Sequence, residues 1–431
     1  MIVEFSVKNF RSINTLQTIS FVATGLKSSD DHSVVDENNV CNEEDMRLLK
    51  TICIYGANGS GKSNAVVALD YFLNAIRNEA SASSNLSELN DPFLYQEQAF
   101  STESFFQIVL LLEGRKFRYG FTLKNDENNL GQQVITNEWL FGTVEKNMSA
   151  YFTREGLITT PKKVLNADKI PSTLPYVHSL YLTHAAAFDS SGICAKIRQY
   201  LKGRTMSNSS RGSLNFRRHL FRMIENPYSK EALISLLYSF NLKFTDITVQ
   251  EQKDDDKKPE RLYSLSRIDL WKQMKIDGNE KSVRLNLIKN ESAGTQKLFE
   301  LAGFLLSVFS MPKGGLLILD EIDSNFHPAL VIEFISLFNN QYINSNKTQL
   351  LFTSHDTNLL SPAIMRRDQF YFSEKLEDES TRLYSLADLK GIRNDADFAK
   401  NYLAGFYGGT PTLEKFTNTK FSTHEYGTVE Y

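Results

Sequence analysis

The residues with the most recognisable chemistry form one stretch, Gly56–Ser63, with the sequence GANGSGKS. It fits the phosphate-binding pattern G-x-x-x-x-G-K-[ST], in which glycines let backbone N–H groups turn toward phosphate oxygens. An apolar run at 49–55 predicts a buried strand before it, and 64–77 predicts a helix whose N-terminus adds partial positive charge. This setting predicts that the chain binds a nucleoside triphosphate.

The lysine and serine that end this pattern are expected to act directly on the triphosphate. Lys62 would neutralise the β- and γ-phosphates, and Ser63 would offer its hydroxyl to Mg²⁺. The candidate nucleotide contacts in this part of the chain are Gly56, Asn58, Gly59, Gly61, Lys62, Ser63 and Asn64.

An apolar strand that ends in two carboxylates follows in the C-terminal half of the chain. Gly315–Leu319 predicts a buried strand, and Asp320 and Glu321 come directly after it. This is the Walker B arrangement: Asp320 is expected in the Mg²⁺ shell, and Glu321 is placed to polarise an attacking water. Together with the phosphate-binding stretch Gly56–Ser63, which is called the P-loop below, these carboxylates predict ATP hydrolysis.

Small residues open the helix that precedes this strand. Residues 292–296 (SAGTQ) stand at the start of an apolar helix at 295–310, and their small side chains leave helical N–H groups open to a γ-phosphate. Taken alone, the same residues fit an ordinary helix start. A further signal is His355, which follows a predicted strand at 349–353, where open α/β sheets bind their ligands.

The order of these four elements resembles that of the ABC-type ATPase heads, namely SMC proteins, RecF and the AAA-type ATPases of bacterial phage-defence systems. In this resemblance SAGTQ at 292–296 corresponds to the signature motif, DEIDSNFHP at 320–328 to Walker B and the D-loop, and His355 to the switch histidine. VKNFRS at 7–12 is similar to the family's N-terminal strand and turn near the adenine. KNYLAGFYG at 400–408 resembles the terminus of RloA, and the likeness extends to overcoming-lysogenization-type ATPase domains.

The resemblance implies roles for individual residues. The residues that would be catalytic are Glu321, His355 and Lys62. The residues that would complete the ATP contacts are Arg11, Ser292, Gly294, Gln296 and Asp323. Mg²⁺ would be held by Ser63, Asp320 and a Q-loop glutamine. The candidates for that glutamine are Gln96, Gln98 and Gln107, of which we assign Gln96.

The resemblance also implies an assembly. ABC-type heads pair so that one chain supplies the P-loop and Walker B while the other supplies the signature helix, which predicts a homodimer or higher oligomer around ATP. The signature carries Ala293 and Thr295 where transporter-type motifs favour glycine, which fits the SMC and RecF side of the family. No long heptad run is present, so a coiled-coil arm is not expected.

Three functions remain open from the sequence. The first is a sensor or motor ATPase of an anti-phage system that regulates a separate effector, a nuclease or a toxin, because the chain shows no nuclease motif of its own. The second is a DNA-repair or recombination ATPase of the RecF type. The third is an ATP-locked scaffold that holds a toxic partner. The resemblance favours the first, whereas ATP binding and hydrolysis rest on the residues themselves.

Composition limits the general class of the chain. It has 431 residues, of which 41% are hydrophobic and 23% charged, and its net charge of −3 means that any nucleic-acid contact must be local. The cysteines at 41, 53 and 194 predict neither a disulfide framework nor a zinc site. Neither a signal peptide nor an apolar run long enough for a membrane span is found, so a soluble, cytoplasmic protein is expected.

The expected fold is α/β: an ABC-ATPase head, or P-loop NTPase, with a mixed parallel core sheet, an antiparallel β-subdomain and a helical insertion. Residues 1–190 would form the N-terminal ATPase lobe with the P-loop and the β-subdomain. Residues 191–285 would form the insertion, and 286–431 the C-terminal lobe with signature, Walker B and switch histidine.

Local patterns add three expectations for secondary structure. Seven carboxylates and no Lys or Arg between Asp30 and Asp45 predict a solvated polar loop over 24–47. The pattern at 262–268 predicts a strand. Short apolar runs at 370–373 and 381–385 predict edge strands.

The predicted insertion contains a concentrated run of positive charge. Lys196–Arg222 carries eight Lys or Arg and no Asp or Glu, with aromatic residues interleaved. One interpretation is contact with nucleic acid or with an acidic partner. The other is a solvated helical face whose long side chains cover apolar surface.

Overall fold

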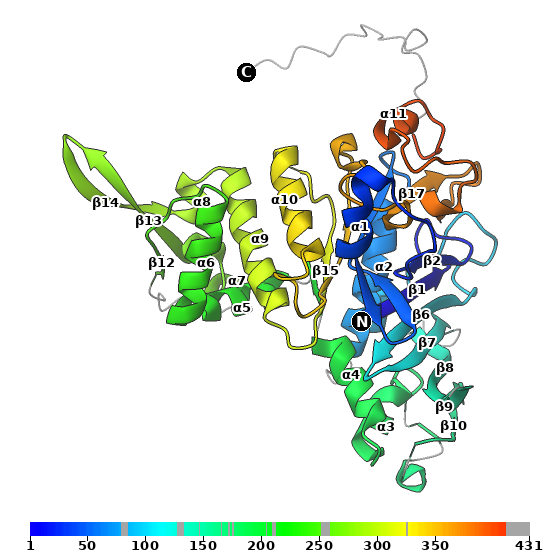
Figure 1. The fold of residues 1–431 in the computed structure, drawn as a ribbon. Coiled ribbons are helices and arrows are strands. Elements are labelled where there is room, and N and C mark those ends of the chain that lie inside the picture. The colour runs from blue at the N-terminus through cyan, green and yellow to red at the C-terminus, as the bar shows by residue number, and fades with distance from the viewer. Residues whose placement is uncertain are drawn as a thin grey trace, which may run out of the picture.

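A six-stranded sheet forms the centre of the computed structural model (Figure 1). The structure describes residues 1–78, 85–126, 133–145, 147–164, 166–170, 173–174, 176–203, 205–208, 213–250, 259–324 and 326–410. The strand order is β11 (Thr205–Ser207), β15 (Leu316–Leu319), β16 (Gln349–Thr353), β5 (Thr51–Gly56), β17 (Phe370–Lys375) and β18 (Thr381–Ser385). The strands from β11 to β17 are parallel, and β18 is antiparallel to β17.

Both faces of this sheet are buried, because its strands direct successive side chains into two different cores. Ile54 of β5 joins a core with α2 (Lys62–Asn78), whereas the next residue, Tyr55, joins one with α9 (Ala293–Phe309) and α10 (Pro328–Asn339). A mainly parallel sheet covered by helices on both faces is the α/β arrangement that continuous apolar strands predict. The expected core sheet is confirmed.

A seven-stranded antiparallel sheet covers the other side of α2. Its order is β10 (Ile158–Pro161), β9 (Asn147–Glu155), β8 (Gln133–Val144), β7 (Arg115–Asn125), β6 (Ser104–Leu112), β1 (Ile2–Lys8) and β2 (Gln17–Ser20). Phe72 of α2 packs against Phe5, Phe106 and Phe121 of this sheet, with ring centroids 5.8, 6.3 and 5.3 Å away. The antiparallel β-subdomain is therefore confirmed, and α2 is held between two sheets.

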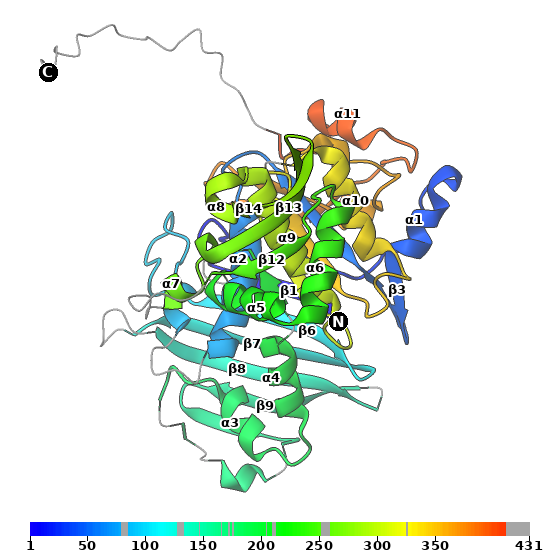
Figure 2. The same cartoon turned by 90° about the vertical axis from the view of Figure 1, so that its left-hand side faces the viewer.

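The remaining elements lie outside the two sheets (Figures 1 and 2). They are α1 (Ser33–Asn38), β3 (Val40–Glu43), β4 (Met46–Leu49), α3 (Tyr181–Phe188), α4 (Ile193–Gly203), α5 (Ser213–Glu225), α6 (Pro227–Ser239), β12 (Asp246–Val249), α7 (Pro259–Leu262), β13 (Ile268–Ile276), β14 (Asn279–Asn286), α8 (Leu287–Asn290) and α11 (Phe398–Leu403). The β13–β14 hairpin extends away from the body in Figure 1. No helix in the described part of the chain has both the length and the apolar character to cross a membrane.

Three local expectations are corrected by the structure. The segment 24–47 is not a plain loop, because it contains α1, β3 and the start of β4, and it buries Val35 and Val40. The segment 262–268 is a strand only at its last residue: it comprises the end of α7, a 3-10 helix at Leu265–Arg267 and Ile268, which begins β13. Strand β17 is not an edge, because it pairs with β5 on one side and β18 on the other.

The core sheet draws strands from all three predicted parts of the chain. Strand β5 comes from 1–190, β11 from 191–285, and the others from 286–431. These parts therefore fold around one sheet, and the boundaries between them stay a prediction.

A buried ion pair joins the β-subdomain to α3. Arg154 of β9 and Glu138 of β8 have fully buried side chains, with Arg154 Nη1 3.2 Å from Glu138 Oε2. The carboxylate also accepts hydrogen bonds from the N–H groups of Tyr181 (2.6 Å) and Leu182 (2.9 Å) in the first turn of α3. Burial raises the pKa of Glu138, and the positive charge of Arg154 opposes that rise.

We expect Arg154→Met to lower the free energy of unfolding at pH 8 by about 3–5 kcal/mol, because it leaves a buried carboxylate without its counter-charge. A raised folded-state pKa means that the folded protein holds the proton of Glu138 more tightly than the unfolded chain does. The loss should therefore shrink as the pH falls toward the unfolded pKa. Urea unfolding at pH 8 and pH 5 measures both values.

Arg393→Met is the control for this measurement, because it removes an exposed ion pair with Asp395. It should leave stability nearly unchanged at both pH values. A loss for Arg154→Met that is the same at pH 5 and pH 8 would contradict the electrostatic explanation.

Candidate active site

Three neighbouring strands end at the same edge of the core sheet. Strand β5 runs into the P-loop at Gly56, β15 is followed by Asp320, and β16 ends at Thr353, just before His355. The strands are adjacent and parallel in the order β15-β16-β5, so their carboxyl ends meet. The structure thereby brings together residues that the sequence places far apart.

Lys62 is the best-buried functional side chain of the P-loop, with 5% of its surface exposed. Its Nζ donates to Gly56 O at 2.8 Å and to Ala57 O at 3.0 Å, which leaves one of its three N–H donors for a phosphate oxygen. Burial lowers the pKa of Lys62, and nearby carboxylates, first that of Asp320, oppose this effect. The P-loop backbone therefore holds the Lys62 side chain in place.

The proposed metal ligands Ser63 and Asp320 lie in direct contact. Ser63 Oγ donates to Asp320 Oδ1 at 3.2 Å, and the Thr353 hydroxyl donates to the same oxygen at 2.6 Å. Hydroxyl and carboxylate oxygens are the donors that Mg²⁺ prefers, so these residues fit that ion. The backbone of Asp320 is fixed by Asn208, whose amide donates to Asp320 O and accepts from Asp320 N–H, both at 2.9 Å.

Glu321 has an unusual backbone conformation for a non-glycine residue, with φ of 51°. Its N–H donates to Thr353 Oγ1 at 2.8 Å, so the same threonine contacts the carboxylate of Asp320 and the backbone of Glu321. Left-handed backbone at a non-glycine residue is often found at functional sites. The exposed side chain of Glu321 lines a cavity of about 480 Å³ together with Asp320 and Arg11.

Arg11 reaches this cavity from the turn after β1. Its guanidinium lies 5.4 Å from the ring centroids of Phe10 and Tyr71, and its Nε is 2.8 Å from Asp91 Oδ2. Arg11 Nη1 also donates to Asn64 Oδ1 at 3.5 Å, directly after the P-loop. Arg11 is therefore close to the P-loop and lines the Walker B cavity. In the sequence, only the family resemblance connected Arg11 with the nucleotide site.

The predicted D-loop aspartate and switch histidine are also joined. Asp323 Oδ2 accepts a hydrogen bond from the backbone N–H of His355 at 3.0 Å. His355 itself is exposed. Asp323 Oδ1 is buried and accepts no hydrogen bond from the described residues. This pair connects the turn after β15 with the turn after β16.

The signature residues lie at the N-terminus of α9, and no hydrogen bond among the described residues joins them to the P-loop. Ser292 caps the helix by accepting from Thr295 N–H at 3.2 Å, and Gly294 lies in the first turn. Gln296 Nε2 donates to Glu291 O at 2.9 Å. Hydrogen bonds therefore connect P-loop, Walker B and switch residues, and among the described residues none of them connects the signature residues with the P-loop.

The hydrogen bond that the structure gives to the Gln96 side chain does not involve the predicted metal ligands. Gln96 Nε2 donates to Asn9 Oδ1 at 2.7 Å, in the turn after β1, and no hydrogen bond connects it with Ser63 or Asp320. Asn9 Oδ1 also accepts from Phe93 N–H at 3.0 Å, so this turn holds the segment around Gln96. A metal-binding role for Gln96 stays a prediction that this arrangement does not support.

Sequence reasoning missed two residues that shape the site. Asn208, which fixes Asp320, belongs to no motif and lies beside it only because β11 pairs with β15. Lys297, one position after the signature, donates from Nζ to Glu321 O at 3.1 Å and Ser324 O at 2.9 Å. It ties α9 to the Walker B turn. Its position in SAGTQK is the one signal from which a functional role could have been suggested.

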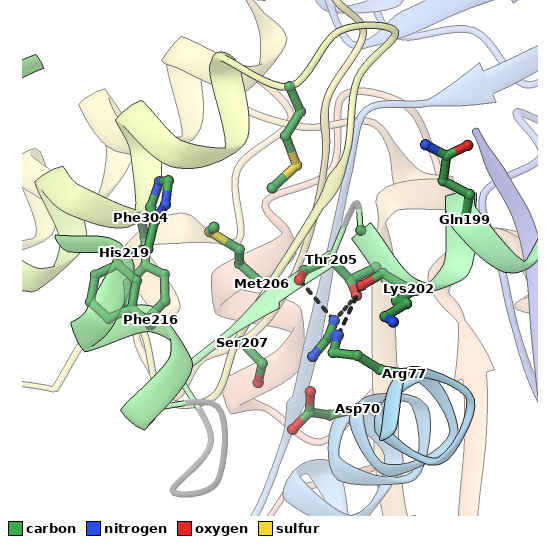
Figure 3. Close-up of a pocket in the computed structure, with 12 residues that line it drawn as sticks. Asp70, Arg77, Gln199, Lys202, Thr205, Met206, Ser207, Phe216, His219 and Phe304 are labelled. Carbon is green, nitrogen blue, oxygen red and sulfur yellow. Dashed lines mark hydrogen bonds between the residues drawn. The ribbon is translucent and has the colours of Figure 1, made fainter. Parts of the chain in front are cut away.

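The predicted basic run is divided in the structure. Lys196 pairs with Glu113 at 2.7 Å, and the guanidinium of Arg218 lies 5.3 Å from the ring centroid of Tyr263. Lys202 and His219 instead line a cavity of about 600 Å³ between α2, α4, β11, α5 and α9 (Figure 3). The described basic residues therefore have different surroundings: an ion pair, an aromatic ring and a cavity. Arg204 and Arg211 lie outside the described residues.

The P-loop between β5 and α2, with the Walker B carboxylates and His355 on adjacent parallel strands, defines the class of the fold as a P-loop NTPase of the ABC-head type. Residues 52–361 match the protein family described as "AAA domain, putative AbiEii toxin, Type IV TA system". The chain belongs to this family.

Solved structures with a similar fold include the SMC head domain from Thermotoga maritima, at 13% identity and a TM-score of 0.42, over 89% of this chain and 98% of that one. Another is the recombination mediator protein RecF with ATP, at 16% identity and a TM-score of 0.35, over 89% of this chain and 99% of that one. These values are too low to transfer a function. No curated protein sequence matches this chain.

Proposed function

We propose that this chain binds ATP and hydrolyses it with Mg²⁺. The observation that carries this proposal is the contact between P-loop and Walker B: Ser63 donates to Asp320, and Thr353 contacts both Asp320 and Glu321. Such a network aligns metal ligands and a water-orienting carboxylate with a phosphate-binding loop. Membership of an AAA family supports the same activity.

The side chains divide the work as follows. Lys62 and the P-loop N–H groups bind the phosphates, and Ser63 and Asp320 would hold Mg²⁺, which when bound neutralises charge on the phosphate oxygens. Glu321 orients a water for attack and accepts its proton. Arg11, on the same cavity, supplies positive charge near the reacting phosphate. Asp323 holds the backbone of His355, which positions the switch turn at the edge of the site.

We further propose that two chains enclose ATP between them. Among the described residues, Ser292 bonds within the first turn of α9, and Gln296 Nε2 donates to the carbonyls of Ile288 at 3.3 Å and Glu291 at 2.9 Å. None of these bonds reaches the P-loop of the same chain, so the N-terminus of α9 can meet a phosphate of a second copy. Lys297 would then connect that contact with Glu321 of its own chain, since it binds the Glu321 carbonyl.

The cellular role that we propose is the regulation of a partner effector, a nuclease or toxin, in cytoplasmic anti-phage defence. The order of motifs, the likeness of residues 400–408 to defence ATPases and the toxin named in the family description support it. An ATP-locked scaffold that holds a toxic partner is the variant in which turnover is negligible.

Equilibrium binding of ATP and phosphate release by the purified chain, each with and without Mg²⁺, test the biochemical proposal. We expect Mg²⁺-dependent turnover, and ATP binding without turnover would favour the scaffold. Absence of ATP binding would overturn the proposal. Co-purification with the product of a neighbouring gene, changed by ATP, tests the cellular role.

A RecF-like response to nucleic acid is the second candidate, and the cavity in Figure 3 favours it. That cavity shares Asp70 and Ser207 with the one that Glu321 lines. Ser207 lines the same cavity as Lys202 and directly precedes Asn208, which fixes Asp320, so a ligand that contacts Ser207 could affect the Walker B backbone.

If nucleic acid acts there, Lys202→Glu should reduce DNA- or RNA-stimulated ATP turnover at least about tenfold at low salt, because it reverses a charge beside the cavity. Basal turnover should stay within about twofold, since Lys202 does not contact the P-loop or Walker B. Lys390→Glu is the control, because Lys390 is exposed and does not line the cavity. Equal stimulation of all three proteins, or none at any salt concentration, would exclude this candidate.

A further inference from the structure

The segment Tyr402–Gly409 returns to the P-loop from the far end of the described chain. Gly409 O accepts a hydrogen bond from the N–H of Ala57, the second P-loop residue, at 2.8 Å. A Cβ added at Gly409 would lie 3.2 Å from Ser373 O and 3.9 Å from Gly56 Cα. The φ of Gly409 is 65°, which glycine adopts readily and other residues rarely do. This close approach to the P-loop therefore requires a glycine.

Three buried tyrosines hold this segment against the core sheet. Tyr402 OH donates to Gly409 O at 3.1 Å, the same oxygen that accepts from the P-loop. Tyr384 OH donates to Tyr407 O at 2.6 Å. The ring of Tyr402 stacks on Phe372 of β17 with centroids 5.4 Å apart, and that of Tyr407 lies 5.7 Å from Phe372. The oxygen that meets the P-loop is thus fixed by side chains as well as by its backbone.

Ala57 connects this contact with the catalytic lysine. Its N–H donates to Gly409 O, and its carbonyl accepts from Lys62 Nζ at 3.0 Å. The other side of the P-loop is fixed through Ser60 O, which accepts from Ser373 Oγ at 2.7 Å and Thr381 Oγ1 at 2.9 Å. The P-loop is therefore held by residues from β17, β18 and the C-terminal segment, none of which belongs to a nucleotide-binding motif.

We propose that Tyr402–Gly409 is a positioning brace that holds the P-loop in its phosphate-binding conformation. Without it, Ala57 would lose the acceptor of its N–H. Among the described residues, the carbonyl that orients Lys62 would then keep only its hydrogen bonds from Ser60 N–H at 3.2 Å and from Lys62 itself. The contacts of the brace lie within this chain, whereas its effect on ATP rests on the proposed function. It makes the nucleotide site depend on the C-terminal segment of the chain.

Hydrogen–deuterium exchange of the P-loop amides, without added nucleotide, tests the brace directly. Tyr402→Phe removes only the hydroxyl that fixes Gly409 O, so exchange across Gly56–Ser63 should become about fivefold faster, the equivalent of one neutral hydrogen bond. Tyr371→Phe is the matched control. Tyr371, in β17, is buried like Tyr402, but its hydroxyl accepts a hydrogen bond from Ser20 N–H at 3.0 Å, not from a residue of the P-loop or the brace. It should leave P-loop exchange unchanged.

Two shortened chains provide an independent comparison. A chain that ends at Thr410 keeps the brace and should exchange as the full chain does, whereas one that ends at Leu403 should exchange faster than Tyr402→Phe. If the shorter chain does not fold, Tyr402→Phe decides the question. Equal P-loop exchange in Tyr402→Phe and Tyr371→Phe would overturn the brace.

The dissociation constant for ATP gives the functional readout. It should rise about fivefold in Tyr402→Phe and stay unchanged in Tyr371→Phe, even if both lose similar stability. Faster exchange with an unchanged ATP affinity would overturn the positioning role. If the full chain binds no ATP while Tyr402→Phe still exchanges faster, the proposed ATPase function fails and the brace stands.

Discussion

Lys62→Ala is expected to weaken ATP binding by at least about 100-fold, the largest loss of affinity that a single substitution in this chain should cause. The ammonium group is buried, already uses two P-loop carbonyls and has one donor left for phosphate. Its removal takes away both a charge-assisted hydrogen bond and the main counter-charge of the triphosphate. Isothermal titration with ATP and with ADP measures the effect, and ATP should lose more because it carries the γ-phosphate.

Stability provides the internal control for this variant. Burial lowers the pKa of Lys62, which means that the folded state disfavours its charged form. The alanine variant should therefore unfold at a temperature no lower than the wild-type chain, and lost binding cannot then be explained by unfolding. Lys390→Ala, an exposed lysine, should bind ATP normally. Normal affinity in Lys62→Ala would rule out the P-loop as the phosphate site.

Glu321→Gln is expected to lower the turnover number by about 10²–10⁴-fold while ATP remains bound. Glutamine keeps the size of the side chain and the backbone hydrogen bond to Thr353, but it does not accept a proton from water. The contact between Ser63 and Asp320 is untouched, so Mg²⁺-dependent binding should persist. Single-turnover phosphate release measures the chemical step, and Glu333→Gln, on the exposed face of α10, is the matched control.

Glu321→Gln should also trap the paired assembly. Sedimentation velocity with ATP is expected to show a dimer or a larger species, and a strictly monomeric ATP-bound chain would contradict the shared site. A mixture of Lys62→Ala and Ser292→Arg chains sharpens this test. Each variant alone should be inactive, but a mixed dimer has one site with an intact P-loop and an intact signature, so mixing should restore turnover. No restoration would indicate that each chain completes its own site.

The sequence was sufficient to predict the residues whose roles depend on the local backbone conformation. Glycine spacing in Gly56–Ser63 sets the loop conformation, and the apolar run before Asp320 is a strand because its side chains are buried on both faces. The parallel sheet then follows, because strands that alternate with helices pack in this way. The meeting of Ser63 with Asp320 is therefore predictable from motif order, and the structure contains it at 3.2 Å.

Other contacts depend on which strands become neighbours, and no short pattern encodes that choice. Asn208 reaches Asp320 because β11 pairs with β15, and Gly409 reaches Ala57 because the C-terminal segment packs on β17. The basic run shows the reverse case, because residues that are near in sequence have different partners in the fold: Lys196 pairs with Glu113, and Arg218 lies over Tyr263. Gln96 was assigned by region alone, and a turn held by Asn9 decided its contact.

The sequence by itself determined the P-loop, the Walker B carboxylates and the α/β class, because these follow from local glycine geometry and from the periodicity of apolar residues. The tertiary structure alone decided how the P-loop is held, by Gly409 through Ala57 and by Ser373 and Thr381 through Ser60. These hydrogen bonds join residues more than 300 positions apart, and only the order of strands in the folded sheet brings such residues together.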